Sequence, residues 1–554
     1  MAHQRLTDEQ KQQIIQQFLA GTSIRKIAED VLGRQSRKST VADFLQASGF
    51  TESYNGKEVA KVDTGEDDTR PVAAGETLPP VHKRKQLSGN RFVFVSAQNN
   101  SFVHDKFLQS LEGYCRVNDA QLIVSTFNYN MNGFQNGQKD DKDIWYDPKI
   151  RQYIRNEPLQ VCEGLVFCGE LNILPTAVRP LSGLSNYTGK DSAIIPHAKM
   201  QLESIPTSKH DPAKMLYTTG CVTQRNYIQK KQGQIAEWHH VFSAVVVEVD
   251  NEGDWFARHV NAESATGCFY DLDRYYTPTG YTEGHNLLAI NYGDVHVAKL
   301  DEDVADVSWR DEDSITGLLK PEYAFLHDVF DHNARNHHNT GNPHIQFQLY
   351  KSRQDSVKDE LRLTAHEIAK IGLGRDIQIV VVASNHDQAL ERWLREGNYK
   401  TDYVNAITFL ELQLAKYKAM DRGDKGFYLF EYAIRKSFDE MDIDDIDIEF
   451  LKEDESFVLA EIEFGEHSHS GNNGARGSVR AFDMRGTKHN IGHTHSAAIM
   501  NGIFVAGVSG KLDMNYNKGG SSWSHSHILT YKNGKRCIVT LKPSKNTGKM
   551  KWRG

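Results

Sequence analysis

The first fifty residues repeat short apolar faces separated by turn residues. Apolar side chains recur at helical spacing over residues 14–19, and Gly21 ends this segment. Two further segments, 23–33 and 36–49, begin at serine residues that can cap a helix. The pattern predicts three short helices within residues 1–50, in the order of a helix-turn-helix.

The third predicted helix begins with Arg37 and Lys38, a position at which such units contact DNA. Residues 1–50 hold seven Lys/Arg and five Asp/Glu, so this segment is mildly basic. Three-helix units of this kind also serve as oligomerisation modules. Both hypotheses, DNA binding and protein contact, remain open.

Two different patterns follow this helical segment. Residues 51–90 have few large apolar side chains, three prolines and mixed charge, which predicts a flexible linker ending in a solvated basic run, 82–85. Residues 91–285 contain buried-type strands such as 91–97, together with an amphipathic helix, which predicts a central α/β domain. No glycine-rich nucleotide motif identifies a ligand for this domain.

Composition narrows the class of protein. Hydrophobic residues make up 39% and charged residues 25% of the 554-residue chain, as in ordinary soluble proteins. The apolar runs are too short for a membrane span, and the N-terminus lacks a signal-peptide core. The six cysteines form no CxxC pair, so we expect a reducing cytoplasm. The net charge of −8 restricts any nucleic-acid contact to local patches.

Histidine is concentrated toward the C-terminus, where 16 of the 24 histidines lie from His285 onward. There, five apolar segments each end in Asp, His or Asn. The polar residues at their ends are Asp294 and His296; Asp328 and Asp331; Asn385, His386 and Asp387; His467 and His469; and His493 and His495. Because ligands bind beyond the carboxyl ends of strands in open α/β sheets, these side chains predict one metal centre. Mixed oxygen and imidazole ligands suit Mn²⁺, Fe²⁺ or Zn²⁺ better than Ca²⁺.

The ordered set DxH, HDVFD, SNHD, His and GHTH resembles the signature of the calcineurin-like metallophosphoesterases, which runs DxH, GDxxD, GNHD, H, GHxH. HDVFD and the Gly-rich loop HSHSGNNGARGS look like the double-strand-break-repair nuclease branch of that superfamily. The layout of the whole chain is similar to the pre-early DNA-transfer proteins of T-odd siphophages, which are linked to host DNA degradation. For residues 286–554 the resemblance implies a fold of two central β-sheets flanked by helices.

The resemblance also implies a role for each motif residue. The residues implied for the first metal are Asp294, His296 and His495, those for the second are Asn385, His467 and His493, and Asp328 would bridge the two. His386 would be a proton donor or a phosphate contact. Asp387 would orient His386.

The sequence departs from the family pattern at three points. His327 and Ser384 replace glycines before Asp328 and Asn385, which changes turn residues and not ligands. The fourth motif offers both His467 and His469, and we favour His467 because its spacing to the Gly-rich loop resembles the nucleases.

Other polar residues near the motifs are weaker candidates. Those that we name as possible substrate contacts are His337, Arg476 and Arg480. His525 and His527 lie on a predicted hairpin around Asn533-Gly534, where we expect them to be mostly structural.

These observations predict a DNA nuclease that hydrolyses phosphodiester bonds with two divalent metal ions, Mn²⁺ first and Mg²⁺, Fe²⁺ or Zn²⁺ as alternatives. We expect the protein to bind DNA, to make no membrane contact and to self-associate as related nucleases do. If the gene is phage-encoded, we expect the protein to be located in the host cytoplasm. The alternatives are a phosphatase or small-molecule phosphodiesterase with the same metals, and a DNA-binding scaffold with a degenerate site. The intact ligand set argues against the scaffold.

Overall fold

The computed structural model describes residues 6–20, 22–34, 38–47, 84–129, 144–209, 211–515 and 517–554. The chain divides into two compact units, Met1–Pro80 and Val81–Gly554, and each is described here by itself. Both α-helices and several β-sheets are present, so the fold class is mixed α/β, as predicted. Within the described residues, no helix is long and apolar enough to cross a membrane.

The first unit contains the three helices that the sequence predicts, α1 (Asp8–Leu19), α2 (Ile24–Leu32) and α3 (Lys38–Ala47). Thr7 and Gln10 form a reciprocal capping box at the start of α1. Ser23 caps α2, and Gly33 ends it in the left-handed conformation that glycine adopts without strain. The core residues, one helical face from each helix, are Ile14, Phe18, Ile27, Ala28, Val41 and Leu45.

The linker predicted over 51–90 lies outside the described residues as far as residue 83. Its last part is not a linker, because β1 (Lys85–Gln86) pairs in parallel with β4. Arg84 also forms an ion pair with Asp191, 2.5 Å between Nη1 and Oδ2, which fixes this segment on the second unit.

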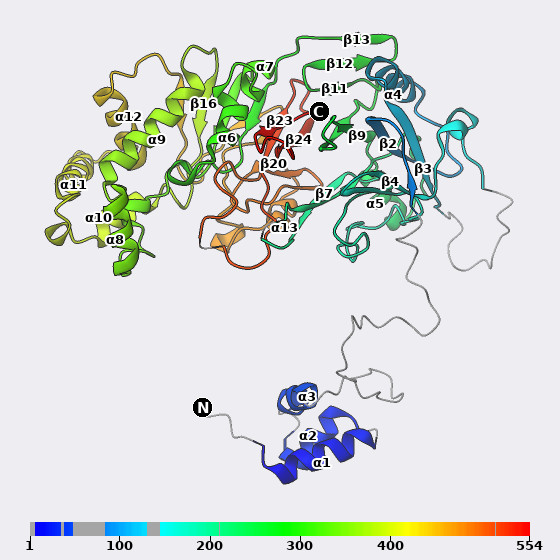
Figure 1. The fold of residues 1–554 in the computed structure, drawn as a ribbon, viewed down its shortest axis with the longest axis horizontal. Coiled ribbons are helices and arrows are strands. Elements are labelled where there is room, and N and C mark those ends of the chain that lie inside the picture. The colour runs from blue at the N-terminus through cyan, green and yellow to red at the C-terminus, as the bar shows by residue number, and fades with distance from the viewer. Residues whose placement is uncertain are drawn as a thin grey trace. The chain divides into compact units, whose positions relative to one another are not determined.

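The largest sheet of the second unit joins strands from distant parts of the chain (Figure 1). β7 pairs antiparallel with β21, so Leu202 lies opposite Ile499, and both belong to one hydrophobic core. The predicted boundary at residue 285 therefore does not separate two cores. In spatial order the strands are β1, β4 (Pro158–Cys162), β5 (Leu165–Cys168), β6 (Ser192–Ile195), β8 (Lys214–Thr218), β7 (Gln201–Ile205), β21 (Ala498–Met500), β22 (Ile503–Val505), β20 (Lys488–Ile491), β19 (Ile462–Glu463) and β18 (Val458–Leu459).

The predicted central region also builds two smaller sheets. One has the order β10 (Trp255–Asn261), β9 (Ser243–Val249), β2 (Arg91–Gln98) and β3 (Gln121–Phe127), and α4 (Asp105–Asn118) packs against it. The other contains β11 (Phe269–Asp271), β12 (Arg274–Thr277) and β13 (Gly280–Thr282). The remaining elements of this region are η3 (Pro148–Tyr153) and α5 (Lys231–His239).

A six-stranded sheet carries three of the predicted motifs. Its order is β17 (Ile448–Phe450), β16 (Gln378–Val381), β15 (Tyr323–Leu326), β14 (Ala289–Asn291), β23 (Ser526–Thr530) and β24 (Arg536–Thr540). The first four strands are parallel, and β23 and β24 form the antiparallel hairpin predicted around Asn533-Gly534. A two-stranded sheet, β25 (Lys542–Pro543) and β26 (Met550–Lys551), ends the chain.

Both faces of this sheet are covered, which explains why its strands are continuous apolar runs. On one face, Ala324 and Leu326 of β15 belong to a core shared with α9 and α12. On the other, the ring of Phe325 stacks on Phe464, with 4.4 Å between ring centroids, beside β19 of the eleven-stranded sheet. The helical elements of the C-terminal region are η4 (Val297–Lys299), α6 (Glu302–Ala305), η5 (Asp306–Arg310), α7 (Ile315–Leu319), η6 (Asn333–Arg335), α8 (Pro343–Ser352), α9 (Val357–Gly372), α10 (Ala389–Glu396), η7 (Tyr399–Thr401), α11 (Ala406–Asp421), α12 (Leu429–Glu440), η8 (Asn472–Gly474) and α13 (Val479–Asp483).

Candidate metal centre

The predicted motifs follow the carboxyl ends of strands in two sheets. Asp294 and His296 come after β14, Asp328 after β15 and Asn385 after β16, three parallel neighbours of the six-stranded sheet. His493 and His495 come after β20 of the eleven-stranded sheet. Because parallel neighbours end at the same edge, the chain delivers these side chains to a common point.

Four of these residues have left-handed backbone conformations that non-glycine residues rarely adopt. The φ angles are 49° at His296, 46° at Asp328, 72° at His493 and 58° at His495. Each such residue costs on the order of 1–2 kcal/mol and persists only where the surrounding structure fixes it. The left-handed turns redirect the chain directly after each strand.

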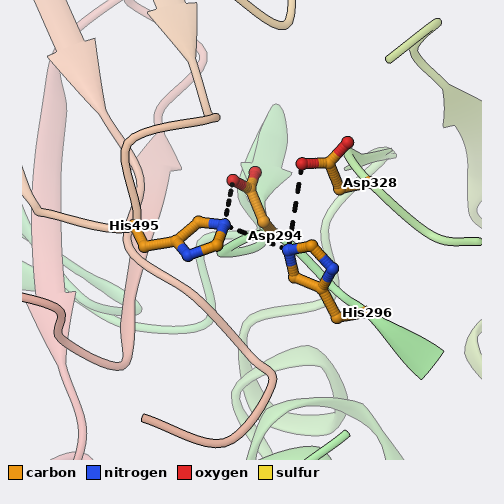
Figure 2. A group of neighbouring side chains, drawn as sticks. All are labelled: Asp294, His296, Asp328 and His495. Carbon is orange, nitrogen blue, oxygen red and sulfur yellow. Dashed lines mark hydrogen bonds and ion pairs between the residues drawn. The ribbon is translucent and has the colours of Figure 1, made fainter. Parts of the chain in front are cut away.

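Asp294, His296, Asp328 and His495 form one buried cluster, shown in Figure 2. The Nε2 atom of His495 lies 3.2 Å from Asp294 Oδ2 and 3.0 Å from His296 Nε2. His296 Nε2 lies 3.8 Å from Asp328 Oδ2. One ligand atom from each of the four residues lies within 4.8 Å of all the others, so a single cation can contact all four.

Asp328 also belongs to a second cluster, with His467 and His493. Its Oδ2 atom lies 3.1 Å from His467 Nε2, and His467 Nδ1 lies 3.9 Å from Asp294 Oδ1. The two clusters therefore share the carboxylate of Asp328. A carboxylate with two oxygens is the group that can contact two cations at once.

Several buried ligand atoms have no hydrogen-bond partner among the described residues. They include Asp294 Oδ1, Asp328 Oδ1, Asn385 Oδ1 and Nδ1 of His467. An unpaired buried polar atom typically costs 1–3 kcal/mol, so a native fold normally pairs such atoms. Carboxylate oxygens and imidazole nitrogens that lie this close together can be satisfied by a divalent cation. The residues of the two clusters therefore fit a divalent metal ion.

The electrostatics favour the form of the carboxylates that binds cations. Burial opposes ionisation of Asp328, but the nearby charge of His467 holds its pKa well below the usual range. The pKa of Asp294 is also lowered, because His467 and His495 outweigh the effect of burial. Both side chains are thus carboxylates at neutral pH, as metal binding requires.

Asp331 has a role that the sequence did not assign. Its Oδ1 atom lies 2.8 Å from Nδ1 of His296, and both residues are buried. Burial opposes protonation of His296, but Asp331 raises the pKa of that ring to about 9. With Nδ1 held by Asp331, His296 directs Nε2 toward the cluster, and such partners fix the tautomer of metal-binding histidines. The second Asp of the HDVFD motif is the sequence signal for this contact.

His386 lies beside this cluster and is 23% exposed at the side chain, so solvent reaches it. Its Nδ1 is 3.8 Å from Asp331 Oδ1, and its ring packs edge-on against His296. Asp387 does not make the contact with His386 that we predicted. It accepts hydrogen bonds from Phe330 N and Ser384 Oγ, at 3.0 and 2.8 Å, and so ties together the turns after β15 and β16.

The structure separates the two histidines of the fourth motif. His467 is buried against Asp328 and Asp294, whereas His469 Nε2 lies 3.4 Å from Glu453 Oε1, outside that contact. His327, which replaces the family glycine, is fully buried with its ring 5.4 Å from that of His467.

The candidate substrate contacts lie outside the ligand clusters. Nε2 of His337 is 2.8 Å from Nη1 of Arg392 in an exposed contact. Arg476 and Arg480 are exposed, and neither forms an ion pair with another described residue. Arg37 lies outside the described residues; Lys38 begins α3, and its side chain also lies outside the description.

The hairpin histidines are buried within the protein. His525 Nδ1 contacts the carbonyl of Val508 at 2.9 Å. His527 accepts a hydrogen bond from Gly293 N and contacts Ser308 Oγ, so it anchors the residue before Asp294. These contacts match the structural role predicted for them.

Protein A1 of Escherichia phage T5 is 40% identical to the chain over 534 residues, which cover 94% of the chain and 93% of that protein. No protein-family model and no solved structure matches the chain.

Proposed function

The chain belongs to the family of phage T5 protein A1, and within that family we propose that it is a metal-dependent nuclease that hydrolyses phosphodiester bonds of DNA. The observation that carries the proposal is the carboxylate of Asp328, which is common to two buried clusters of potential metal ligands. Two-metal sites of this kind serve phosphoester hydrolysis in phosphatases and nucleases.

Each residue of the two clusters has a place in the proposed centre, as does Asn385, which the motif resemblance adds to them. Asp294, His296 and His495 would hold one ion, Asn385, His467 and His493 the other, and Asp328 both. When bound, Mn²⁺, or alternatively Mg²⁺, Fe²⁺ or Zn²⁺, supplies positive charge to a phosphate and lowers the pKa of water.

The remaining residues of the site bind and orient. Asp331 holds His296 in the tautomer whose Nε2 faces the cluster. His386 is exposed enough to meet substrate. Burial lowers the pKa of His386, which favours a neutral ring, and a neutral ring contacts phosphate oxygen through its N–H. Asp387 holds the turn that carries Asn385 and His386.

Three further features support the proposal, one for the metallophosphoesterase fold and two for DNA as the substrate. The ligands come from the ends of two facing sheets, the arrangement that the motif resemblance implies. The first unit has the three helices of a helix-turn-helix. The relative is a phage protein, so we propose that the enzyme acts on DNA in the cytoplasm of the infected host.

The test uses the purified full chain with linear and supercoiled DNA, in Mn²⁺ or in excess chelator. We expect cleavage with Mn²⁺, none with chelator, and loss of cleavage in Asp328→Asn. The matched control is Asp105→Asn, an exposed aspartate paired with Lys149, which should cleave like the wild type. Hydrolysis of a generic phosphate monoester with intact DNA would identify a phosphatase instead. Absence of both activities and of bound metal would identify a scaffold.

A further inference from the structure

Helix α11 is apolar on two opposite faces. Its inner face buries Phe409, Leu412 and Ala419, and the helix lies beside α10 and α12 at the outer end of the helical layer (Figure 1). Lys416 pairs with Glu391 of α10 at 2.9 Å, and Glu411 pairs with Lys436 of α12. The helix is therefore held in place with its second face directed outward.

The outer face presents a row of large apolar side chains. Its members are Tyr403, Ile407, Leu410, Leu414, Tyr417 and Met420, which are between 47% and 87% exposed. Within the helix, from Ile407 to Tyr417, the spacing is three, four and three residues, which is the spacing of a coiled-coil seam, and Tyr403 lies in the turn before the helix. An exposed row of large apolar side chains marks an interaction surface, so we expect a partner to cover this face. We call these six residues the α11 seam.

We propose that the α11 seam binds the α11 seam of a second copy of this chain, in an antiparallel pair around a two-fold axis. From Ile407 to Tyr417 the seam has the spacing three, four, three, which is the same in both directions. An antiparallel copy therefore places Ile407 opposite Tyr417 and Leu410 opposite Leu414, as a two-fold interface requires.

The exposed area matches a dimer. At about 200 Å² for a large side chain, the six residues leave roughly 700–800 Å² exposed, which is the area that each partner contributes to a standard interface. The first unit of the chain is the alternative occupant. Among its described large apolar side chains, only Leu19 is strongly exposed, which is too little area to cover the α11 seam.

The first experiment measures the mass of the full chain in solution by sedimentation and light scattering. The chain mass is 62.7 kDa, and we expect the wild type to associate through this face. Leu414→Glu should halve the mass. Leu174→Glu is the matched control, because Leu174 and Leu414 are both 54% exposed, and it should leave the mass unchanged. A monomeric wild type, or an unchanged mass in Leu414→Glu, would overturn the proposal.

A cross-linking experiment tests the register. Residues 407 and 417 of one helix are about 15 Å apart, too far for a disulfide within one chain. We expect the double variant Ile407→Cys/Tyr417→Cys to form disulfide-linked dimers on mild oxidation, beyond the background of the six native cysteines. Ile407→Cys alone should not, because the two copies of residue 407 lie about 15 Å apart in this register. Dimers from the single variant would show parallel pairing and overturn it. None of the substituted residues belongs to the metal clusters, so these outcomes are independent of cleavage.

Discussion

Replacing Asp331 with alanine tests whether this carboxylate positions a metal ligand. The substitution removes the buried contact of 2.8 Å between Asp331 Oδ1 and His296 Nδ1. Without this contact, His296 is free to change tautomer. Loss of such a partner typically weakens metal binding or activity by about 10–100-fold. That corresponds to about 1.4–2.7 kcal/mol, and it agrees with the roughly 1.5–3 kcal/mol of a hydrogen bond to a charged group.

The assay is calorimetric titration of the metal-free protein with Mn²⁺, with thermal unfolding as the check on folding. We expect Asp331→Ala to bind 10–100-fold more weakly, in line with the range for such partners. Asp331→Asn should lose less, because the amide oxygen still accepts a hydrogen bond from His296 Nδ1. Asp105→Ala, at an exposed position, is the control. Wild-type affinity in a folded Asp331→Ala protein would refute the positioning role.

Three further outcomes are expected. His467→Ala should abolish Mn²⁺-dependent cleavage and His469→Ala should retain most of it, because the structure buries only His467 against Asp328; equal losses would contradict this assignment. Burial raises the pKa of Glu360 to about 7, so its protonated form stabilises the fold below pH of about 4.5, and this contribution is lost as pH rises through 7. Glutamine does not ionise, so the unfolding free energy of Glu360→Gln relative to that of the wild type should rise by about 2–3 kcal/mol between pH 5 and pH 8. Denaturant unfolding at the two pH values measures this difference, and a difference that does not change with pH would count against the raised pKa. DNA affinity should fall at least about tenfold between 50 and 200 mM salt, and a constant affinity would exclude phosphate contacts.

Local patterns predicted the elements of this chain well, because they depend on neighbouring residues. The three helices of the first unit follow from caps such as Thr7 and Ser23 and from apolar periodicity. The hairpin at Asn533-Gly534 follows from turn chemistry, with Gly534 at a φ of 73°. The strand ends that carry Asp294 and Asp328 follow from apolar runs that stop at polar residues.

Pairings between distant segments could not be predicted in this way. β7 and β21 are almost three hundred residues apart, and the sequence of neither strand indicates that the two pair. The same limit applies to side-chain partners: Asp387 stands next to His386 in the sequence, yet its carboxylate turns inward to Phe330 N, 57 residues away. The resemblance implied a contact with His386, whereas the carboxylate contacts Phe330 N and Ser384 Oγ.

The candidate ligand residues are costly to hold in place, which explains why a few residues need a large fold around them. His296, Asp328, His493 and His495 all occupy left-handed backbone, and together they destabilise the chain locally by several kcal/mol, on the order of 1–2 each. The unpaired buried oxygens of Asp294 and Asp328 add to that cost. Two packed sheets and a helical layer are needed to hold such residues in place. Because the fold leaves these atoms without hydrogen-bond partners, a cation that contacts them recovers the free energy that their burial costs. The cost of leaving these atoms unpaired would therefore contribute to affinity for a cation, whereas the backbone strain would be the same with and without it.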